Sequence, residues 1–219
     1  MAAYPFQPRS PLCDSHAEEL ASMWTHIAGA IFAVVASILM LATCDRQPAH
    51  LVSAGVFGAT LILLYLASSL YHACRSPRTK AWLQFFDHAC IYLLIAGSYT
   101  PLALVTLKGP WGWSIFGIVW FLAISGILMK SLVKGRKEGA WSTALYVAMG
   151  WLIVIAARPV IASLSPAGLC WLIGGGLAYT LGIVFFVWNR LPFNHAIWHG
   201  FVLLGSACHV IATAFHILR

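Results

Sequence analysis

Two histidines four residues apart, His195 and His199, are the residues best spaced to do chemistry in this sequence of 219 residues. On a helix such a pair lies on one face, one turn apart, so both imidazoles can reach one metal ion. His72 follows Ser68 with the same spacing, which puts a hydroxyl on the same face as a further candidate ligand. Three imidazoles leave a fourth tetrahedral position for water, which is typical of a catalytic zinc ion.

Acidic residues accompany these histidines. Asp87, near the start of an apolar stretch, could hold a zinc-bound water or take its proton, since zinc lowers the pKa of bound water to about 7. Glu19 and His26 begin another apolar stretch and are possible accessory residues. Alternatively, each histidine is only a hydrogen-bond donor to a lipid headgroup or a neighbouring helix. The histidine pair, His72 and an acid within an apolar stretch together favour a zinc site.

The elements that must position these residues are membrane-spanning helices. Hydrophobic residues make up 61% of the chain and charged residues only 9%, against roughly a quarter charged in soluble domains. The charged residues leave seven uncharged runs of 19 to 31 residues, and a helix needs about 20 residues to cross a bilayer. We therefore predict an all-α fold, a single seven-helix bundle over residues 1–219. The expected helices are 22–43, 50–74, 82–107, 111–131, 140–158, 166–188 and 194–217.

The basic residues predict how the bundle is oriented. With seven spans, nine Lys and Arg residues fall on the N-terminal side of the membrane and four on the other. The positive-inside tendency therefore predicts a cytoplasmic N-terminus and an outer C-terminus, in a multi-pass protein of the cell membrane, a bacterial inner membrane. The net charge of +7 then reflects topology and anionic headgroups, and nucleic acid is not an expected partner. In this topology the polar residues named above all lie near the cytoplasmic face, and intramembrane ionisable groups are usually functional.

Other polar and small residues are interpreted as structural. His209 and His216 lie roughly 21 Å and 32 Å along the helix from His195, too far to bind the same ion. Six scattered cysteines indicate packing rather than a disulfide framework, although Cys74 and Cys90 are weaker metal-ligand candidates. The remaining residues interpreted in this way are His88, expected to be incidental, His16 and His50, expected in loops, and the Gly174–Gly176 run, expected at a close helix contact.

These motifs resemble the hemolysin III family, the bacterial branch of the progestin and adipoQ receptor family. The resemblance covers nearly the whole chain in the expected order. It rests on Glu18-Glu19 with Thr25-His26, Ser68-Ser69-Leu70-Tyr71-His72, Phe86-Asp87-His88 with Gly97-Ser98-Tyr99-Thr100-Pro101, and His195-Ala196-Ile197-Trp198-His199. It implies a seven-helix fold with zinc near the cytoplasmic face, held by His72, His195 and His199, with Ser68 and Asp87 around a bound water. It also implies lipid-amide hydrolysis, as proposed for the receptors and the related alkaline ceramidases.

Two classes of function follow. The first is a zinc-dependent membrane hydrolase that acts on a lipid amide or ester, with membrane lipids as partners and a lipid-like substrate. The second is a non-enzymatic membrane protein with structural zinc, either a pore-forming cytolysin, as the family name suggests, or a sensor of lipid state. A pore normally needs a polar stripe through several helices, whereas these polar residues are confined to one end. This disfavours the pore but not the sensor.

Overall fold

The fold is a bundle of membrane-spanning helices. The computed structural model describes residue 13 and residues 15–132 and 140–219. Four of the basic residues that were counted on the N-terminal side of the membrane lie outside the described residues, namely Arg9, Lys134, Arg136 and Lys137. In that part of the chain, seven helices are long and apolar enough to cross a membrane. This confirms the predicted all-α, seven-helix class.

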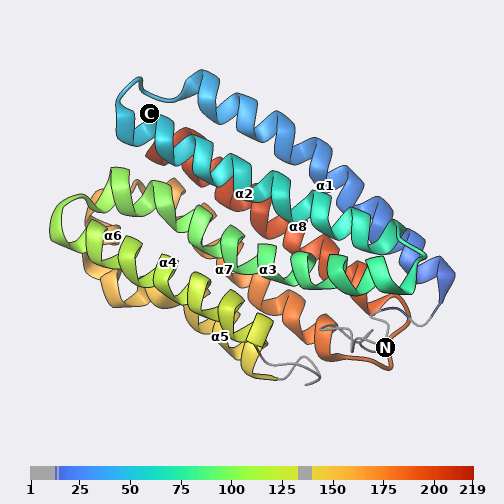
Figure 1. The fold of residues 1–219 in the computed structure, drawn as a ribbon. Helices are drawn as coiled ribbons and strands as arrows, with labels where there is room; N and C mark the ends of the chain where they lie inside the picture. Colours follow the sequence, from blue (N-terminus) through green and yellow to red (C-terminus); the bar gives the residue numbers. More distant parts are fainter. Residues whose placement is uncertain (1–12, 14, 133–139) are drawn as a thin grey trace.

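The helices run side by side along the long direction of the molecule (Figure 1). Helix α1 packs against α2 and α8, α2 also packs against α3, and α7 packs against α8. The elements are α1 (His16–Thr43), α2 (Pro48–Ala73), α3 (Pro77–Pro101) with the π-helical segment Leu102–Leu107, α4 (Gly109–Leu132), α5 (Ala140–Gly150), the 3-10 segment Leu152–Ala156, α6 (Ala157–Ser163), α7 (Pro166–Val187), α8 (Asn194–Ala212) and the π-helical segment Thr213–Ile217.

Capping residues decide where several helices begin. Helix α1 starts at His16 rather than at residue 22, because the Ser15 hydroxyl accepts a hydrogen bond from the Glu18 backbone amide at 3.2 Å. Helix α3 starts at Pro77 rather than at residue 82, since proline is favoured in the first turn, where its missing N–H costs nothing. The first of these shifts brings the acidic residues of the N-terminal motif into the first turn of α1.

The fifth span is interrupted, where one continuous helix over 140–158 was predicted. Helix α5 ends at Gly150, a 3-10 segment follows, and α6 then continues to Ser163. The Tyr99 hydroxyl donates to the Gly150 carbonyl at 2.7 Å and accepts from the Ile153 amide at 3.0 Å. Lipid cannot pair backbone groups, so this hydroxyl satisfies two groups that the interruption would leave unpaired.

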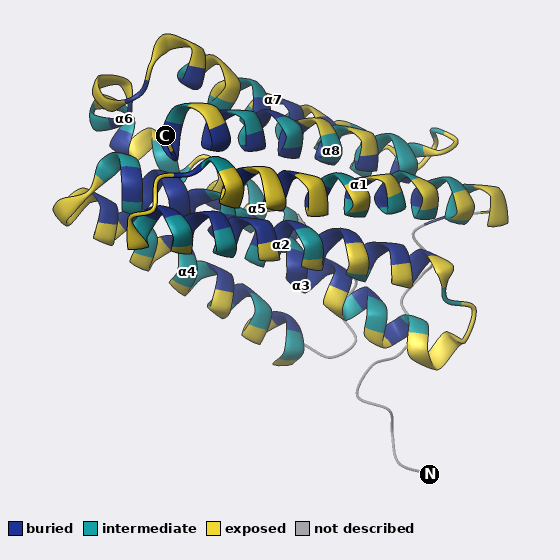
Figure 2. Cartoon of the chain, turned by 90° about the horizontal axis from the view of Figure 1, so that it is seen from above, coloured by how far each residue is buried: buried dark blue, intermediate teal, exposed yellow. Residues whose placement is uncertain are grey.

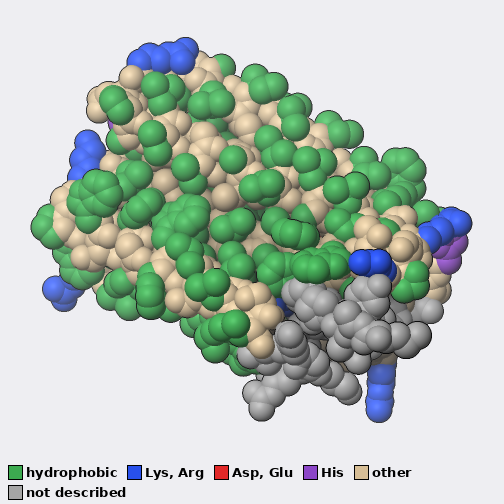
Figure 3. Space-filling view, viewed as in Figure 1, with side chains coloured by type: hydrophobic (Ala, Val, Ile, Leu, Met, Phe, Trp, Pro, Cys, Tyr) green, Lys and Arg blue, Asp and Glu red, His purple; other side chains and the backbone are tan. Residues whose placement is uncertain are grey.

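The surface of the bundle is suited to lipid. Buried residues line the faces that the helices turn toward one another, and exposed residues face outward (Figure 2). Large apolar side chains such as Ile31, Phe121 and Val184 are exposed. On the face in Figure 3, hydrophobic side chains cover the sides, while Lys and Arg gather toward the two ends. The protein is therefore a multi-pass membrane protein.

One basic residue is not where the orientation argument put it. Lys130, near the end of the predicted helix 111–131, was counted among the basic residues of the following loop, but it lies in the last turn of α4 and is buried. The other basic residues still favour a cytoplasmic N-terminus, which stays a prediction. A reporter fused after residue 135 should be active in the cytoplasm, and one fused after residue 165 should be active outside. The reverse pattern would move the polar cluster to the outer leaflet.

Candidate metal site

Three buried histidines converge at one end of the bundle. His72 lies in the last turn of α2, and His195 and His199 lie in the first turns of α8. One nitrogen of each ring can be chosen so that all three lie within 4.8 Å of one another. The ring centroids of the pair on α8 are 4.5 Å apart, and each is 5.1 Å from that of His72. The structure thus brings together the three residues that the spacing singled out.

The hydrogen bonds of His72 and His199 use Nδ1 and leave Nε2 of each of these two rings for a metal. His72 Nδ1 lies 2.7 Å from the Glu19 carboxylate and donates to it, and His199 Nδ1 donates to the Ser22 carbonyl at 3.1 Å. Nε2 of His72 and of His195 is buried without a hydrogen-bond partner among the described residues. An unpaired buried polar atom lowers the folding stability by about 1–3 kcal/mol, and coordination of a metal ion would recover that loss. The residues therefore fit a metal ion held by three imidazoles.

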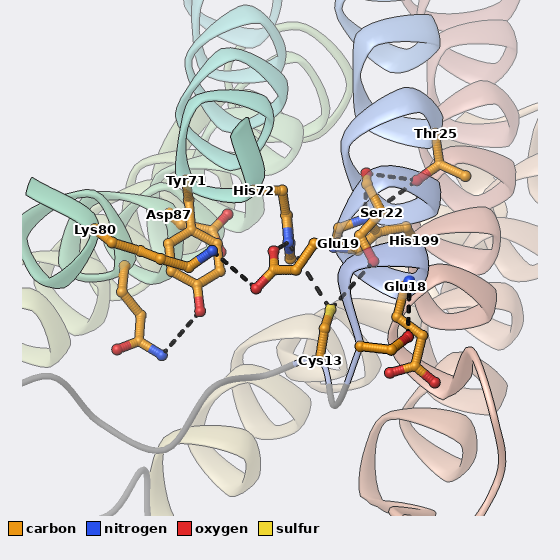
Figure 4. Close-up of polar contacts among 12 residues, drawn as sticks. Cys13, Glu18, Glu19, Ser22, Thr25, Tyr71, His72, Lys80, Asp87 and His199 are labelled. Carbon is orange, nitrogen blue, oxygen red and sulfur yellow. Dashed lines mark hydrogen bonds and ion pairs between the residues drawn. The ribbon is translucent and has the colours of Figure 1, made fainter. Parts of the chain in front are cut away.

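Helix α1 supplies the groups that orient the histidines (Figure 4). Glu19 accepts from His72 through one carboxylate oxygen and from Lys80 Nζ, at 2.8 Å, through the other. The Thr25 hydroxyl donates to the Ser22 carbonyl at 2.8 Å, beside His199. The sequence pattern indicated Glu19 only as an accessory residue and did not indicate Ser22 or Lys80. The spacing of Glu19, Ser22 and Thr25 by three residues, which places them on one helix face, was an available signal.

We expect Glu19→Gln to lower the affinity of the site for a divalent metal such as zinc by about 10–100-fold while the fold is kept. A neutral amide accepts more weakly from His72 Nδ1, so the ring is held less firmly and its Nε2 becomes a poorer donor. The measurement is zinc titration against a competing chelator. Glu18→Gln is the matched control, since Gln retains an oxygen that can accept from the Phe193 amide, 2.9 Å away. Equal affinities in the two variants would contradict this role.

The other predicted site residues are buried on α1, α2 and α3. Asp87 is buried on α3 and borders the same cavity as His195 and His199. Ser68 is fully buried one turn before His72, and its hydroxyl has no hydrogen-bond partner among the described residues. His26 stacks on the His199 ring, with centroids 3.4 Å apart. The cluster therefore draws residues from α1, α2, α3 and α8.

A cavity of about 130 Å³ leads away from the histidines between α3, α5, α7 and α8. Asp87, His195 and His199 border one part of it, and Gly176 and His209 border another. Most of the remaining lining side chains are aliphatic or aromatic, including those of Leu94, Ile95, Tyr146, Val147, Trp151, Ile183, Phe186, Trp198 and Val202. The predicted polar cluster thus opens onto a largely apolar chamber.

The two histidines further along the seventh span form hydrogen bonds away from the three-histidine cluster. His209 Nε2 donates to the Leu172 carbonyl at 3.3 Å, and His216 Nδ1 lies 3.0 Å from the Ser165 hydroxyl. A Cβ at Gly175 would overlap the His209 ring, so the predicted close helix contact occurs there. At the neighbouring Gly174 and Gly176 a Cβ would meet nothing within 4 Å.

Two histidines interpreted as incidental are buried instead. His88 Nδ1 accepts a hydrogen bond from Lys130 Nζ at 3.1 Å, and His88 Nε2 lies 4.0 Å from an Asp87 oxygen. His50 lies in the first turn of α2, not in a loop, with Nε2 4.0 Å from Asp45. The packing of α3 against α4 creates the first of these contacts, so spacing along one helix did not indicate it. His16, also expected in a loop, is the exposed first residue of α1.

Cys13 was interpreted as a packing residue, yet it borders the site. Its sulfur lies 3.6 Å from the Ser22 hydroxyl and 4.0 Å from His72 Nδ1. Burial raises the pKa of the Cys13 thiol to about 12, so the thiol is protonated at neutral pH when no cation is bound. The cysteines favoured from the sequence, Cys74 and Cys90, belong to no candidate metal cluster among the described residues.

Fold and site together define a polytopic membrane protein with a buried histidine cluster at one end. The chain belongs to the Haemolysin-III related family, which matches residues 15–210. It is 43% identical to Hemolysin-3 of Bacillus cereus over 203 residues, 92% of each chain. It is 41% identical to a Hemolysin-3 homolog of Bacillus subtilis over 204 residues, 92% of this chain and 95% of the relative. The human Monocyte to macrophage differentiation factor is 29% identical over 216 residues, 95% of this chain and 87% of that protein. The resemblance seen in the motifs is thereby confirmed.

Proposed function

We propose that the protein is a zinc-dependent integral membrane hydrolase that cleaves a lipid amide or ester. The observation that carries this proposal is the buried three-histidine cluster, of which His195 and His199 border a cavity together with Asp87. Nε2 of His72 and of His195 has no hydrogen-bond partner among the described residues. A ligand set made of imidazoles suits zinc, and three protein ligands leave one position open for chemistry. Calcium and magnesium, by contrast, prefer oxygen ligands.

The roles of the side chains follow from their positions. Zinc bound there would polarise the scissile carbonyl and lower the pKa of a water molecule to about 7. Asp87 takes the proton of the attacking water and returns it to the leaving amine or alkoxide. The Ser68 hydroxyl orients that water, and Glu19 holds His72 in the tautomer that presents Nε2. His26, stacked on His199, limits the movement of that ring.

The cavity supports a lipid-like substrate. Its lining is mostly apolar, and burial of each methylene group is worth about 0.8 kcal/mol. A chain bound in the chamber would bring its carbonyl to the end where Asp87, His195 and His199 lie. The membrane around the bundle supplies such molecules at high local concentration.

A structural role for the metal is the second candidate. The three candidate ligands come from α2 and α8, so an ion would tie the ends of these two helices together without any turnover. This arrangement fits a sensor of membrane lipid state. A pore is a weaker candidate, since the polar cluster lies at one end and the cavity beyond it is largely apolar.

The experiment that tests the proposal joins metal analysis with an acyl-release assay. We expect the purified protein to retain zinc and to release fatty acid from one class in a panel of ceramide-like amides and glycerol esters. Removal of zinc with a chelator should abolish release, and added zinc should restore it. A zinc-loaded protein that cleaves no member of the panel would favour the structural alternative.

Gly176→Leu should impair cleavage of long-chain substrates more than of short ones. Gly176 borders the cavity and a Cβ there meets nothing within 4 Å. A Leu side chain would therefore occupy the space in which we propose that the acyl chain of the substrate binds. Loss of two or three buried methylene contacts costs about 2 kcal/mol, or roughly 30-fold in kcat/KM. Gly174→Leu is the matched control, because it also has space but does not border the cavity. Equal effects in both variants would contradict chain binding there.

A further inference from the structure

A second group of metal-ligating side chains lies beside the three histidines. The Cys13 sulfur, a carboxylate oxygen of Glu19 and a ring nitrogen of His72 lie within 4.8 Å of one another. Cys13 comes from the segment before α1, Glu19 from the first turn of α1 and His72 from the last turn of α2. Figure 4 shows the sulfur pointing toward the His72 ring and the Ser22 hydroxyl. Three separate segments thus place an S, an O and an N donor at one point.

The two groups use different atoms of His72. Nδ1 faces Glu19 at 2.7 Å and Cys13 at 4.0 Å, whereas Nε2 has no partner among the described residues and belongs with His195 and His199. The two nitrogens of an imidazole lie on different edges of the ring, and each can bind its own metal ion. His72 therefore stands between two candidate ion positions.

We propose that Cys13, Glu19 and Nδ1 of His72 form a second metal site, for a thiophilic divalent cation such as zinc or cadmium. A thiolate, a carboxylate and an imidazole are ligands of zinc, and the sulfur selects against magnesium and calcium. The thiolate and the carboxylate together balance the charge of a dication. Lys80 can keep its contact with the other oxygen of Glu19, 2.8 Å away. The site does not depend on the proposed hydrolase activity.

Binding at this site exchanges protons for the cation. The S–H bond of Cys13 breaks, its proton passes to solvent, and a bond from sulfur to the cation replaces it, without any redox change. The Nδ1–H bond of His72 also breaks when Nδ1 binds the cation. Its proton passes to solvent when an ion occupies Nε2, which leaves the ring as an imidazolate, and otherwise moves to Nε2. The hydrogen bond from His72 to Glu19 is lost in the exchange. Two cations bound to one ring repel each other, so an ion here weakens binding at the three-histidine cluster. On the proposed function, the second site is therefore placed to lower the hydrolase activity when metal is in excess.

Cadmium titration of the full-length protein in detergent tests this site, because thiolate-bound cadmium absorbs in the ultraviolet. Wild type should bind two ions and develop the thiolate absorption. Cys13→Ser should bind one ion and show no such band, while His199→Ala should keep the band although the three-histidine cluster is broken. His72→Ala should lose both bound ions and the absorption band. Cys74→Ser is the control, since its sulfur instead contacts the Ser76 carbonyl at 3.7 Å.

Alkylation followed by mass spectrometry supplies a test that needs no variant. Cadmium should protect Cys13 of the wild type from a maleimide, and magnesium should not. Loss of the band in Cys13→Ser and His72→Ala but not in His199→Ala or Cys74→Ser, together with this protection, would establish the site. A thiolate band of wild-type intensity in Cys13→Ser, or no protection of Cys13 in wild type, would overturn it. Neither result touches the three-histidine cluster, which His199→Ala reports separately.

Discussion

Asp87→Asn is expected to keep the metal and the fold while turnover falls by roughly 10² or more, the usual worth of a general base. Asp87 is not one of the three candidate imidazole ligands, so its loss should leave the metal affinity nearly unchanged. Asn is nearly isosteric and can still accept a hydrogen bond, but it cannot take a proton. Substrate binding should therefore change little, and the loss should appear in kcat rather than in KM.

The matched control for this variant is Asp45→Asn. Asp45 is an exposed acid in the α1–α2 connection, at the opposite end of the bundle, and its removal should leave turnover intact. Metal content and thermal unfolding of both variants are measured beside the acyl-release rate. Undiminished hydrolysis by Asp87→Asn would remove this residue from the proposed mechanism. It would then be reinterpreted as a partner that only orients the site.

Replacing any of His72, His195 and His199 by Ala should reduce zinc affinity by more than the 10–100-fold typical of losing a supporting hydrogen bond. Each residue offers one of three ligand nitrogens, and two imidazoles alone leave the ion poorly held. Because metal binding stabilises the folded state by mass action, added zinc should stabilise the variants less than it stabilises wild type. Metal analysis and unfolding with and without zinc measure both effects.

His209→Ala provides the control for these histidine variants. It lies on the same helix and is buried, but its Nε2 donates to a backbone carbonyl instead of facing the cluster. It should retain stoichiometric zinc. A triple Ala variant of the three candidate ligands that also retained it would remove the three-histidine cluster from consideration as a metal site. The Cys13 group would then have to be tested alone.

The membrane class of the protein was readable from the sequence because it depends on local composition. Apolar runs of sufficient length must form helices in lipid, whatever they pack against. Helix ends were less accessible, since the hydroxyl of Ser15 and the ring of Pro77 decide them locally. The interruption after Gly150 was not predicted at all. It depends on the Tyr99 hydroxyl of another helix, which satisfies the backbone groups on both sides.

In the candidate site, too, some features could be predicted from the sequence and others depend on contacts between helices. The spacing of four between His195 and His199, and between Ser68 and His72, follows from helical periodicity and was visible in the residues alone. The supporting contacts of Glu19, Ser22 and Lys80 cross between helices, and so does the contact between His88 and Lys130. Cys13 lies outside every predicted helix, and nothing local indicated that it would meet His72.

The sequence by itself determined that this chain spans a membrane seven times and carries one pair of imidazoles on a single helix face, because hydrophobicity and periodicity act over neighbouring residues. Only the tertiary structure decided which nitrogen of His72 and of His199 is left for a metal. That choice is made by acceptors on α1, namely Glu19 for His72 and the Ser22 carbonyl for His199. Contacts between helices far apart in the chain depend on packing of the whole bundle, which no local pattern encodes.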